Sequence, residues 1–164
     1  MNAPLPPIRE ESLRIAGVPV GQHLRAKRTS VRPVSAENGS IIIVVATDAP
    51  LLPHQLKRIA KRAGMGLARM GSSAGNGSGD IFVAFSTANS AALSGERTAQ
   101  ASFVGNDWLD PLFEATVQAT EEAIVNALVA ARDMRGTEGR YAKALDHEAL
   151  VALLKRYGRL AGER

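Results

Sequence analysis

Hydroxyl and amine groups are the candidate nucleophiles of this chain, because it contains no cysteine. The absence of cysteine from its 164 residues excludes a thiolate nucleophile, disulfide bonds and thiolate metal sites. The three histidines, His23, His54 and His147, are far apart in the sequence. Their spacing matches neither a metal-ligand set nor a Ser-His pair. We therefore interpret them as solvated side chains, and we expect neither a metal nor a cofactor.

Ser40 is the candidate nucleophile because of where it lies. The dipeptide Gly39-Ser40 is common in proteins, but here it ends a segment rich in Arg, Ser and Pro and precedes the β-branched run Ile41–Ala46. Attack of the Ser40 hydroxyl on the Gly39 carbonyl, followed by hydrolysis of the resulting ester, would free the Ser40 amine. An α-amine has a pKa of about 7.7–8.0 and can accept the hydroxyl proton near neutral pH. The dipeptide therefore predicts self-cleavage and a nucleophile that needs no histidine.

Two patterns that suggest phosphate or nucleic-acid binding are weak. The glycine-rich run 75–79 resembles a phosphate-binding loop, but it lacks the Gly-Lys-Ser/Thr ending and precedes a predicted strand instead of a helix. A net charge of +4 could attract nucleic acid. However, no known binding module accompanies the charge, and aromatic residues make up only 4% of the chain. Nucleotide binding is therefore discounted, and nucleic-acid binding is the weakest functional hypothesis.

The composition is that of one ordinary globular domain. Hydrophobic residues make up 45% of the chain and charged residues 22%. The most apolar run, Ile41–Ala46, is far shorter than the roughly 20 residues of a membrane span. The first residues show no secretory signal pattern. The sequence therefore predicts a cytoplasmic protein without a membrane partner.

Apolar periodicity predicts strands and helices that pack in layers. The run Ile41–Ala46 is typical of a central strand buried on both faces. In the helix that follows, Gly64 and Gly66 permit close approach of a neighbour. With so few strongly apolar strands, the predicted sheet is thin. The expected elements are an edge or hairpin strand over 13–18, an exposed connector over 22–39, a strand over 41–46, a helix from Pro53 to about Gly71, a loop over 71–79, a strand over 81–86, an excursion over 87–105, a helix capped by Asp110 and ending near Gly136, and a helix capped by Asp146 and stopped by Gly158.

Four stretches of the chain resemble one family. The longest runs from Gly39 to Arg58 and begins Gly-Ser-Ile-Ile-Ile-Val-Val-Ala-Thr-Asp-Ala-Pro. The second, from Gly75 to Asn89, begins Gly-Asn-Gly-Ser-Gly-Asp-Ile-Phe. Leu13–Gly21 and Leu109–Ala115 extend the match. On these residues the chain resembles the L-aminopeptidase/D-esterase family, which is related to the β-aminopeptidases.

The resemblance implies a self-processing serine hydrolase with an αββα sandwich of the aminopeptidase/ornithine-acetyltransferase-like type. In that family a precursor is cut before the serine that matches Ser40, and the resulting α and β chains fold together. Residues 1–39 then correspond to a remnant of the α region, and residues 40–164 to a β-chain catalytic domain. The family's second serine and its acidic residue fall on Ser78 and Asp80. The resemblance implies that Ser78 hydrogen-bonds the Ser40 hydroxyl or amine, and that Asp80 orients the pair.

The region before Ser40 departs from the family pattern. Family precursors carry a much longer α region, so the sandwich is expected to be incomplete in this chain. That region supplies the oxyanion donors, a tyrosine and an asparagine. The asparagine should fall shortly before Leu13, where residues 6–9 read Pro-Pro-Ile-Arg. Loss of one such donor typically lowers the rate ~100- to 1,000-fold, so the isolated chain is expected to be a poor enzyme.

The sequence leaves three origins and three functions open. The chain is a truncated reading frame, a split-gene subunit with a separate α chain, or a descendant kept for another purpose. Its first predicted function is removal of N-terminal residues from small peptides, amides or esters through an acyl-enzyme on Ser40, with L, D or β preference open. The second is a structural or interaction role for the scaffold, and the third is nucleic-acid binding. Exposed apolar sheet or helix surface is expected to favour an α-chain partner or a homo-oligomer.

Overall fold

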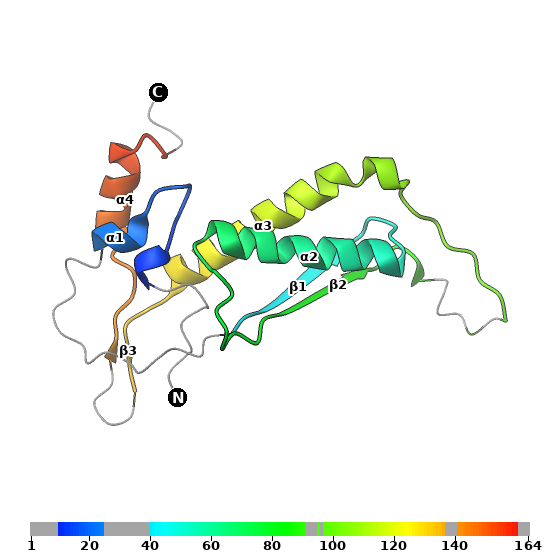
Figure 1. Cartoon of the computed structure of the whole chain (residues 1–164), viewed down its shortest axis with the longest axis horizontal. Helices are drawn as coiled ribbons and strands as arrows, with labels where there is room; N and C mark the ends of the chain where they lie inside the picture. The colour runs from blue at the N-terminus through cyan, green and yellow to red at the C-terminus, as the bar shows by residue number, and fades with distance from the viewer. Residues whose placement is uncertain (1–9, 25–39, 91–94, 96, 137–140, 161–164) are drawn as a thin grey trace.

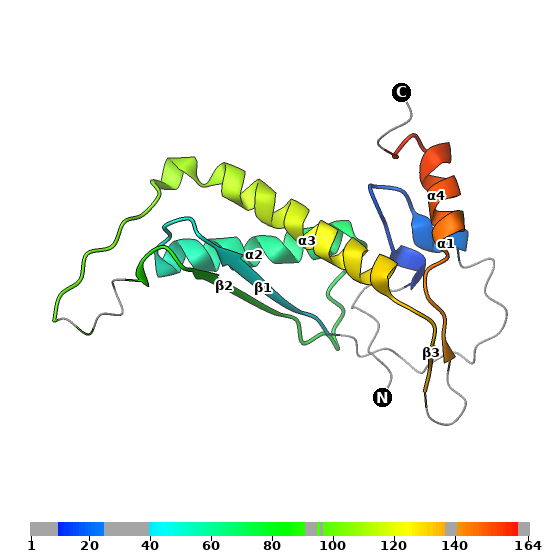
Figure 2. The same ribbon diagram turned by 180° about the vertical axis from the view of Figure 1, so that it is seen from behind.

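The computed structural model describes residues 10–24, 40–90, 95, 97–136 and 141–160. Its centre is a β-α-β unit made of strand β1 (Ile42–Thr47), helix α2 (Pro53–Arg69) and strand β2 (Ile81–Ser86). The strands pair in parallel, from Ile42 opposite Ile81 to Thr47 opposite Ser86. Helix α3 (Asp110–Ala130) lies beside α2, as both views show (Figures 1 and 2). The predicted mixed α/β architecture is therefore confirmed.

Helices α2 and α3 approach closely at Gly66, as the sequence predicted. A Cβ placed on Gly66 would lie 2.7 Å from the Thr120 Cβ and from the Val117 carbonyl oxygen. Thr116 and Thr120 are buried in this contact, and their hydroxyls donate to the carbonyls of Leu112 and Thr116 at 2.7 and 2.8 Å. Buried threonines are tolerated here because each hydroxyl is satisfied within its own helix.

The two faces of the sheet differ in burial because side chains alternate along each strand. One face packs against the helices through partly buried side chains of both strands. The other face is open: Ile42 is 68% exposed, Val44 59% and Phe85 44%. Among the described residues β1 pairs only with β2, so the prediction of a central strand buried on both faces is wrong for this chain. The apolar sheet surface expected from the sequence is present.

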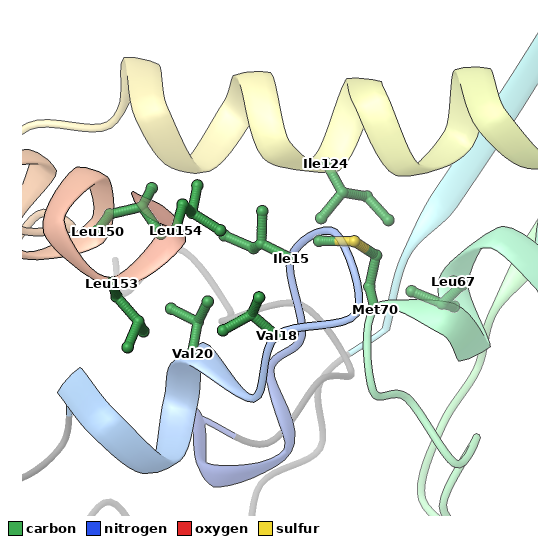
Figure 3. Close-up of a cluster of buried hydrophobic side chains, with 9 residues drawn as sticks. All are labelled: Ile15, Val18, Val20, Leu67, Met70, Ile124, Leu150, Leu153 and Leu154. Atoms are coloured by element: carbon green, nitrogen blue, oxygen red, sulfur yellow. The ribbon is translucent and has the colours of Figure 1, made fainter. Parts of the chain in front are cut away.

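A hydrophobic cluster joins both ends of the chain at the end of the molecule where α2 and α3 finish (Figures 1 and 3). It includes the segment that leads into helix α1 (Val20–Leu24), and helix α4 (His147–Arg156) covers it. Asp146 caps α4 as predicted, accepting from the Ala149 amide at 2.9 Å. The cluster residues are Ile15, Val18, Val20, Leu67, Met70, Ile124, Leu150, Leu153 and Leu154.

The segment 13–18 corrects the predicted edge strand. It forms a tight turn with one antiparallel bridge between Ile15 and Val18, and Ala16 and Gly17 adopt positive φ values of 50° and 79°. Backbone in that region cannot continue a strand. The predicted connector over 22–39 is also shorter, because residues 22–24 belong to α1; residues 25–39 lie outside the described residues.

Smaller elements complete the fold. The loop predicted over 71–79 is irregular, with a turn in which the Ser78 amide donates to the Gly75 carbonyl at 2.8 Å. Two 3-10 helices, η1 (Glu10–Ser12) and η4 (Asn106–Trp108), and a hairpin of β3 (Met134–Arg135) and β4 (Tyr141–Ala142) were not predicted. Within the described ranges, no helix is long and apolar enough to cross a bilayer.

Polar side chains tie down the loops where both strands finish. The Ser86 hydroxyl donates to the Ala49 carbonyl at 2.6 Å and accepts from the Ala88 amide at 3.2 Å. The Thr47 hydroxyl accepts from the Ala49 amide at 3.1 Å. These bonds fix the connections that lead out of the sheet.

Candidate active site

The predicted site residues lie where the two strands begin. Ser40 lies two residues before β1, and Asp80 immediately precedes β2, with Ser78 two residues further upstream. Because the strands are parallel, their N-terminal ends lie at the same edge of the sheet. This edge is at the end of the molecule that also holds α1 and α4 (Figure 1).

Three hydrogen bonds connect the two strand beginnings. The Ser40 hydroxyl oxygen accepts from the Gly79 amide at 2.9 Å. The Asp80 carboxylate accepts from the Ile41 amide at 3.1 Å, and the Ile81 amide donates to the Ile41 carbonyl at 3.0 Å. Ser40 is exposed and Asp80 is partly buried. The Ser40 hydroxyl therefore contacts Gly79, the residue that comes just before Asp80 in the sequence.

Ser78 differs from the other site residues because its hydroxyl oxygen has no partner. The oxygen is buried, and within the described part of the chain no hydrogen bond satisfies it. A buried hydroxyl without a partner costs about 1–3 kcal/mol. Such a group in a native fold requires an explanation.

An open pocket of about 490 Å³ adjoins the site on the helix side of the sheet. Ser78 and Asp80 line it at the strand edge, and the C-terminal half of α2 forms its opposite wall. Phe82 and the loop that follows α2 complete it, through Ser72, Ser73 and Ala74. Ser40 is not among the residues that line the pocket.

The other residues considered in the sequence are Gly39 and the three histidines. Gly39 is outside the described residues. His54 and His147 are exposed at the starts of α2 and α4. His23 contacts the Tyr157 hydroxyl, with 3.1 Å between the ring nitrogen and the oxygen. All three histidines are exposed, as the sequence predicted.

Gly79 is the contact that sequence reasoning missed. Its backbone amide, rather than a side chain, holds the Ser40 hydroxyl oxygen. A backbone donor leaves no signature in residue type, so only the register of the two strands could have revealed it. That register places Gly79 level with Ser40, two residues before the pair Ile42 and Ile81.

Solved structures of similar fold place the chain among aminopeptidases with a variant of the Ntn hydrolase fold. The chain superposes on the L-aminopeptidase D-Ala-esterase/amidase of Ochrobactrum anthropi with a TM-score of 0.79 at 46% identity, covering 93% of this chain and 42% of that one. That protein is described as a prototype for the serine aminopeptidases and a variant of the Ntn hydrolase fold. A β-aminopeptidase from Burkholderia sp. matches with a TM-score of 0.75 at 42% identity, covering 91% of this chain and 41% of that one.

The chain belongs to peptidase family S58, whose model matches residues 7–142. It is 49% identical to the β-peptidyl aminopeptidase BapA of Sphingosinicella microcystinivorans over 93% of this chain and 41% of that protein. The corresponding enzyme of Sphingosinicella xenopeptidilytica is 40% identical over 87% of this chain and 38% of that protein. The chain therefore spans about two-fifths of the length of these relatives.

Proposed function

We propose that this chain carries the nucleophile-bearing part of a serine aminopeptidase that cleaves itself between Gly39 and Ser40. The supporting observation is the hydrogen-bonded strand edge, where Ser40, Gly79 and Asp80 meet beside the buried hydroxyl of Ser78. Membership of peptidase family S58 supports the same reaction class.

Self-cleavage would proceed through an ester. The Ser40 hydroxyl oxygen attacks the Gly39 carbonyl carbon, and the bond from that carbon to the Ser40 nitrogen breaks as the nitrogen takes up the proton that the hydroxyl loses. Water then hydrolyses the ester, which releases residue 39 as a carboxylate and leaves Ser40 with a free amine. That amine, with a pKa of about 7.7–8.0, serves as the base for later turnovers.

Ser78 and Asp80 would support the amine and the hydroxyl of Ser40. The unpartnered Ser78 hydroxyl can accept from the ammonium form or donate to the neutral amine. The Asp80 carboxylate, already bonded to the Ile41 amide at 3.1 Å, lies one residue from the amine and favours its charged form. These roles let one residue supply the nucleophile and the base while its neighbours hold both in place.

The substrates proposed are small peptides, amides or esters from which an N-terminal residue is released through an acyl-enzyme on Ser40. The relatives are named as β-peptidyl aminopeptidases and as an L-aminopeptidase D-Ala-esterase/amidase, and these names motivate the choice. A cytoplasmic location is proposed from the sequence alone.

The open sheet face supports a partner for this chain. Exposed Ile42, Val44, Ile81, Val83 and Phe85 form an apolar surface of a kind that soluble monomers rarely expose. An α chain encoded separately, or further copies of this chain, would cover it. A structural role for the scaffold without catalysis remains the second candidate, because it needs the same surface.

Mass spectrometry of the purified protein tests the proposal. We expect a fragment beginning at Ser40 to accumulate during incubation near pH 8, and a Ser40→Ala variant to stay intact. A separately encoded α chain, if one is found, is added in a parallel reaction. If the wild-type chain and Ser40→Ala stay equally intact in both reactions, self-cleavage is excluded and the structural role is favoured.

A further inference from the structure

The Gly79 amide lies at the start of the hydrogen-bond ladder between β1 and β2. Alternate residues on the β2 side direct their amides toward β1, and these amides donate to backbone carbonyls. Ile81 donates to Ile41 and Thr87 to Thr47, both at 3.0 Å. The same register places Gly79 opposite Ser40, and there the amide donates to a side chain, the Ser40 hydroxyl oxygen, at 2.9 Å.

The absence of a side chain at Gly79 keeps this contact open. A Cβ placed there would lie 3.3 Å from the Ser40 hydroxyl oxygen. A Cβ placed on Gly75, in the same loop, would meet nothing within 4 Å. Neither glycine has a positive φ, so backbone conformation does not require glycine at either position. Space around the nucleophile distinguishes Gly79 from Gly75.

The neighbouring bonds hold the amide in place. The loop turns back through the Ser78 amide and the Gly75 carbonyl at 2.8 Å, and Asp80 is fixed by the Ile41 amide at 3.1 Å. Gly79 lies between these two anchors. Its amide is therefore pre-positioned toward the Ser40 oxygen and needs no rearrangement when charge develops there.

We propose that the Gly79 amide is a catalytic group that stabilises the Ser40 oxygen when the ester on that oxygen is hydrolysed. The inference rests on the proposed function. In this step the neutral Ser40 amine takes a proton from water as the water adds to the acyl carbon. The bond from that carbon to the Ser40 oxygen then breaks, and its electron pair moves to the oxygen. The ammonium so formed gives its proton to the oxygen, which restores the hydroxyl and leaves the acyl group as a carboxylic acid. The Gly79 amide donates to the oxygen throughout, which makes it a better leaving group.

The test compares Gly79→Pro, which lacks the amide proton, with Gly79→Ala, which keeps it but crowds the oxygen, and with Gly75→Ala as the matched control. Cleavage at 39/40 is followed by intact mass, and hydroxylamine is added to trap ester. We expect Gly79→Pro to hydrolyse its ester about 100-fold more slowly and so to accumulate trappable ester. Gly79→Ala should slow a few-fold, and Gly75→Ala should match wild type.

Amide exchange tests the contact without requiring cleavage. Loss of the acceptor in Ser40→Ala should speed exchange of the Gly79 amide by roughly two- to tenfold, the change expected for loss of one hydrogen bond. The Ile41 amide, held by Asp80, is the internal control and should not change.

The outcomes separate the two proposals. If the wild type cleaves while a folded Gly79→Pro variant, verified by circular dichroism, cleaves at the same rate without trapped ester, the role of Gly79 is overturned and the proposed function stands. If the wild type does not cleave, the proposed function fails for this chain and the catalytic role falls with it. Unchanged exchange of the Gly79 amide in Ser40→Ala overturns the contact itself.

Discussion

The two ends of the β1/β2 sheet carry the same kinds of residue in different states. Where the strands finish, the hydroxyls of Ser86 and Thr47 bond to the backbone of the outgoing loops. Where the strands begin, the Ser78 hydroxyl is buried without a partner among the described residues, and the Ser40 hydroxyl accepts from Gly79. A satisfied hydroxyl stabilises a fold, whereas an unsatisfied buried one costs free energy. The hydroxyls at one end therefore stabilise the fold, and the other end is the one for which we propose catalysis.

The largest effect should come from removing the unpartnered hydroxyl. Ser78→Ala is expected to slow cleavage at 39/40 by about 100-fold, because it deletes the hydroxyl proposed to support the Ser40 amine. Its stability should not fall, since no hydrogen bond in the described part of the chain is lost. Intact mass against time and thermal unfolding measure the two quantities. A large loss of stability with normal cleavage would contradict a catalytic role for Ser78 and would indicate that it stabilises the fold.

Ser86→Ala should give the opposite result at the other end. It removes the bonds to the Ala49 carbonyl and the Ala88 amide, and at roughly 1 kcal/mol each the free energy of unfolding should fall by about 2 kcal/mol. Denaturant unfolding measures this loss. Cleavage of the folded protein should keep its wild-type rate. Ser102→Ala is the control, because the contact of Ser102 with Asn89 uses its backbone.

Asp80→Asn should shift the pH dependence. A carboxylate beside the Ser40 amine favours the charged amine and raises its pKa, so loss of the charge lowers that pKa. Activity requires the neutral amine, and the midpoint of the rising limb should therefore move to lower pH by about one unit. Rates measured across the range from mildly acidic to mildly basic pH test the shift. Asp48→Asn, which changes an exposed carboxylate just after β1, should leave the midpoint unchanged.

The smallest effect is expected at Thr47. Thr47→Val removes the hydroxyl that accepts from the Ala49 amide at 3.1 Å, at a cost of about 0.5–1 kcal/mol. The Ala49 amide is only partly buried and follows the exposed Asp48, so water can take the place of the lost acceptor. Denaturant unfolding of Thr47→Val and Ser86→Ala side by side shows which variant loses more free energy of unfolding. A change in cleavage rate here would contradict the division between the two ends.

Much of the central fold could be predicted from the sequence. The apolar runs 41–46 and 81–86 predicted β1 and β2, and the helical repeat of apolar residues over 53–71 predicted α2. Asp146 predicted the start of α4. The burial of Thr116 and Thr120 in α3 was not predicted, because threonine counts as a polar residue in a hydropathy pattern. Their burial depends on bonds to their own helix and on the space beside Gly66.

The site was only partly predictable. Ser40 was singled out from its position, and Ser78 and Asp80 from a resemblance. Their meeting depends on parallel pairing, which no residue type reveals. The Gly79 contact could not be foreseen, because any residue except proline has a backbone amide. Recognising this donor requires the register of β1 against β2.

The burial of the segment 15–20 would have a consequence for a protein cut at the proposed position. Ile15, Val18 and Val20 are at most 5% exposed within the cluster shared with α4, and the Arg14 amide bonds to the Met70 carbonyl at 3.0 Å. After a cut at position 39, these contacts would hold the released peptide in place as a second subunit. Unfolding would then become a dissociation, so the melting temperature should rise with protein concentration. Refolding would then require the two fragments to associate, so the cut protein should refold more slowly when it is diluted.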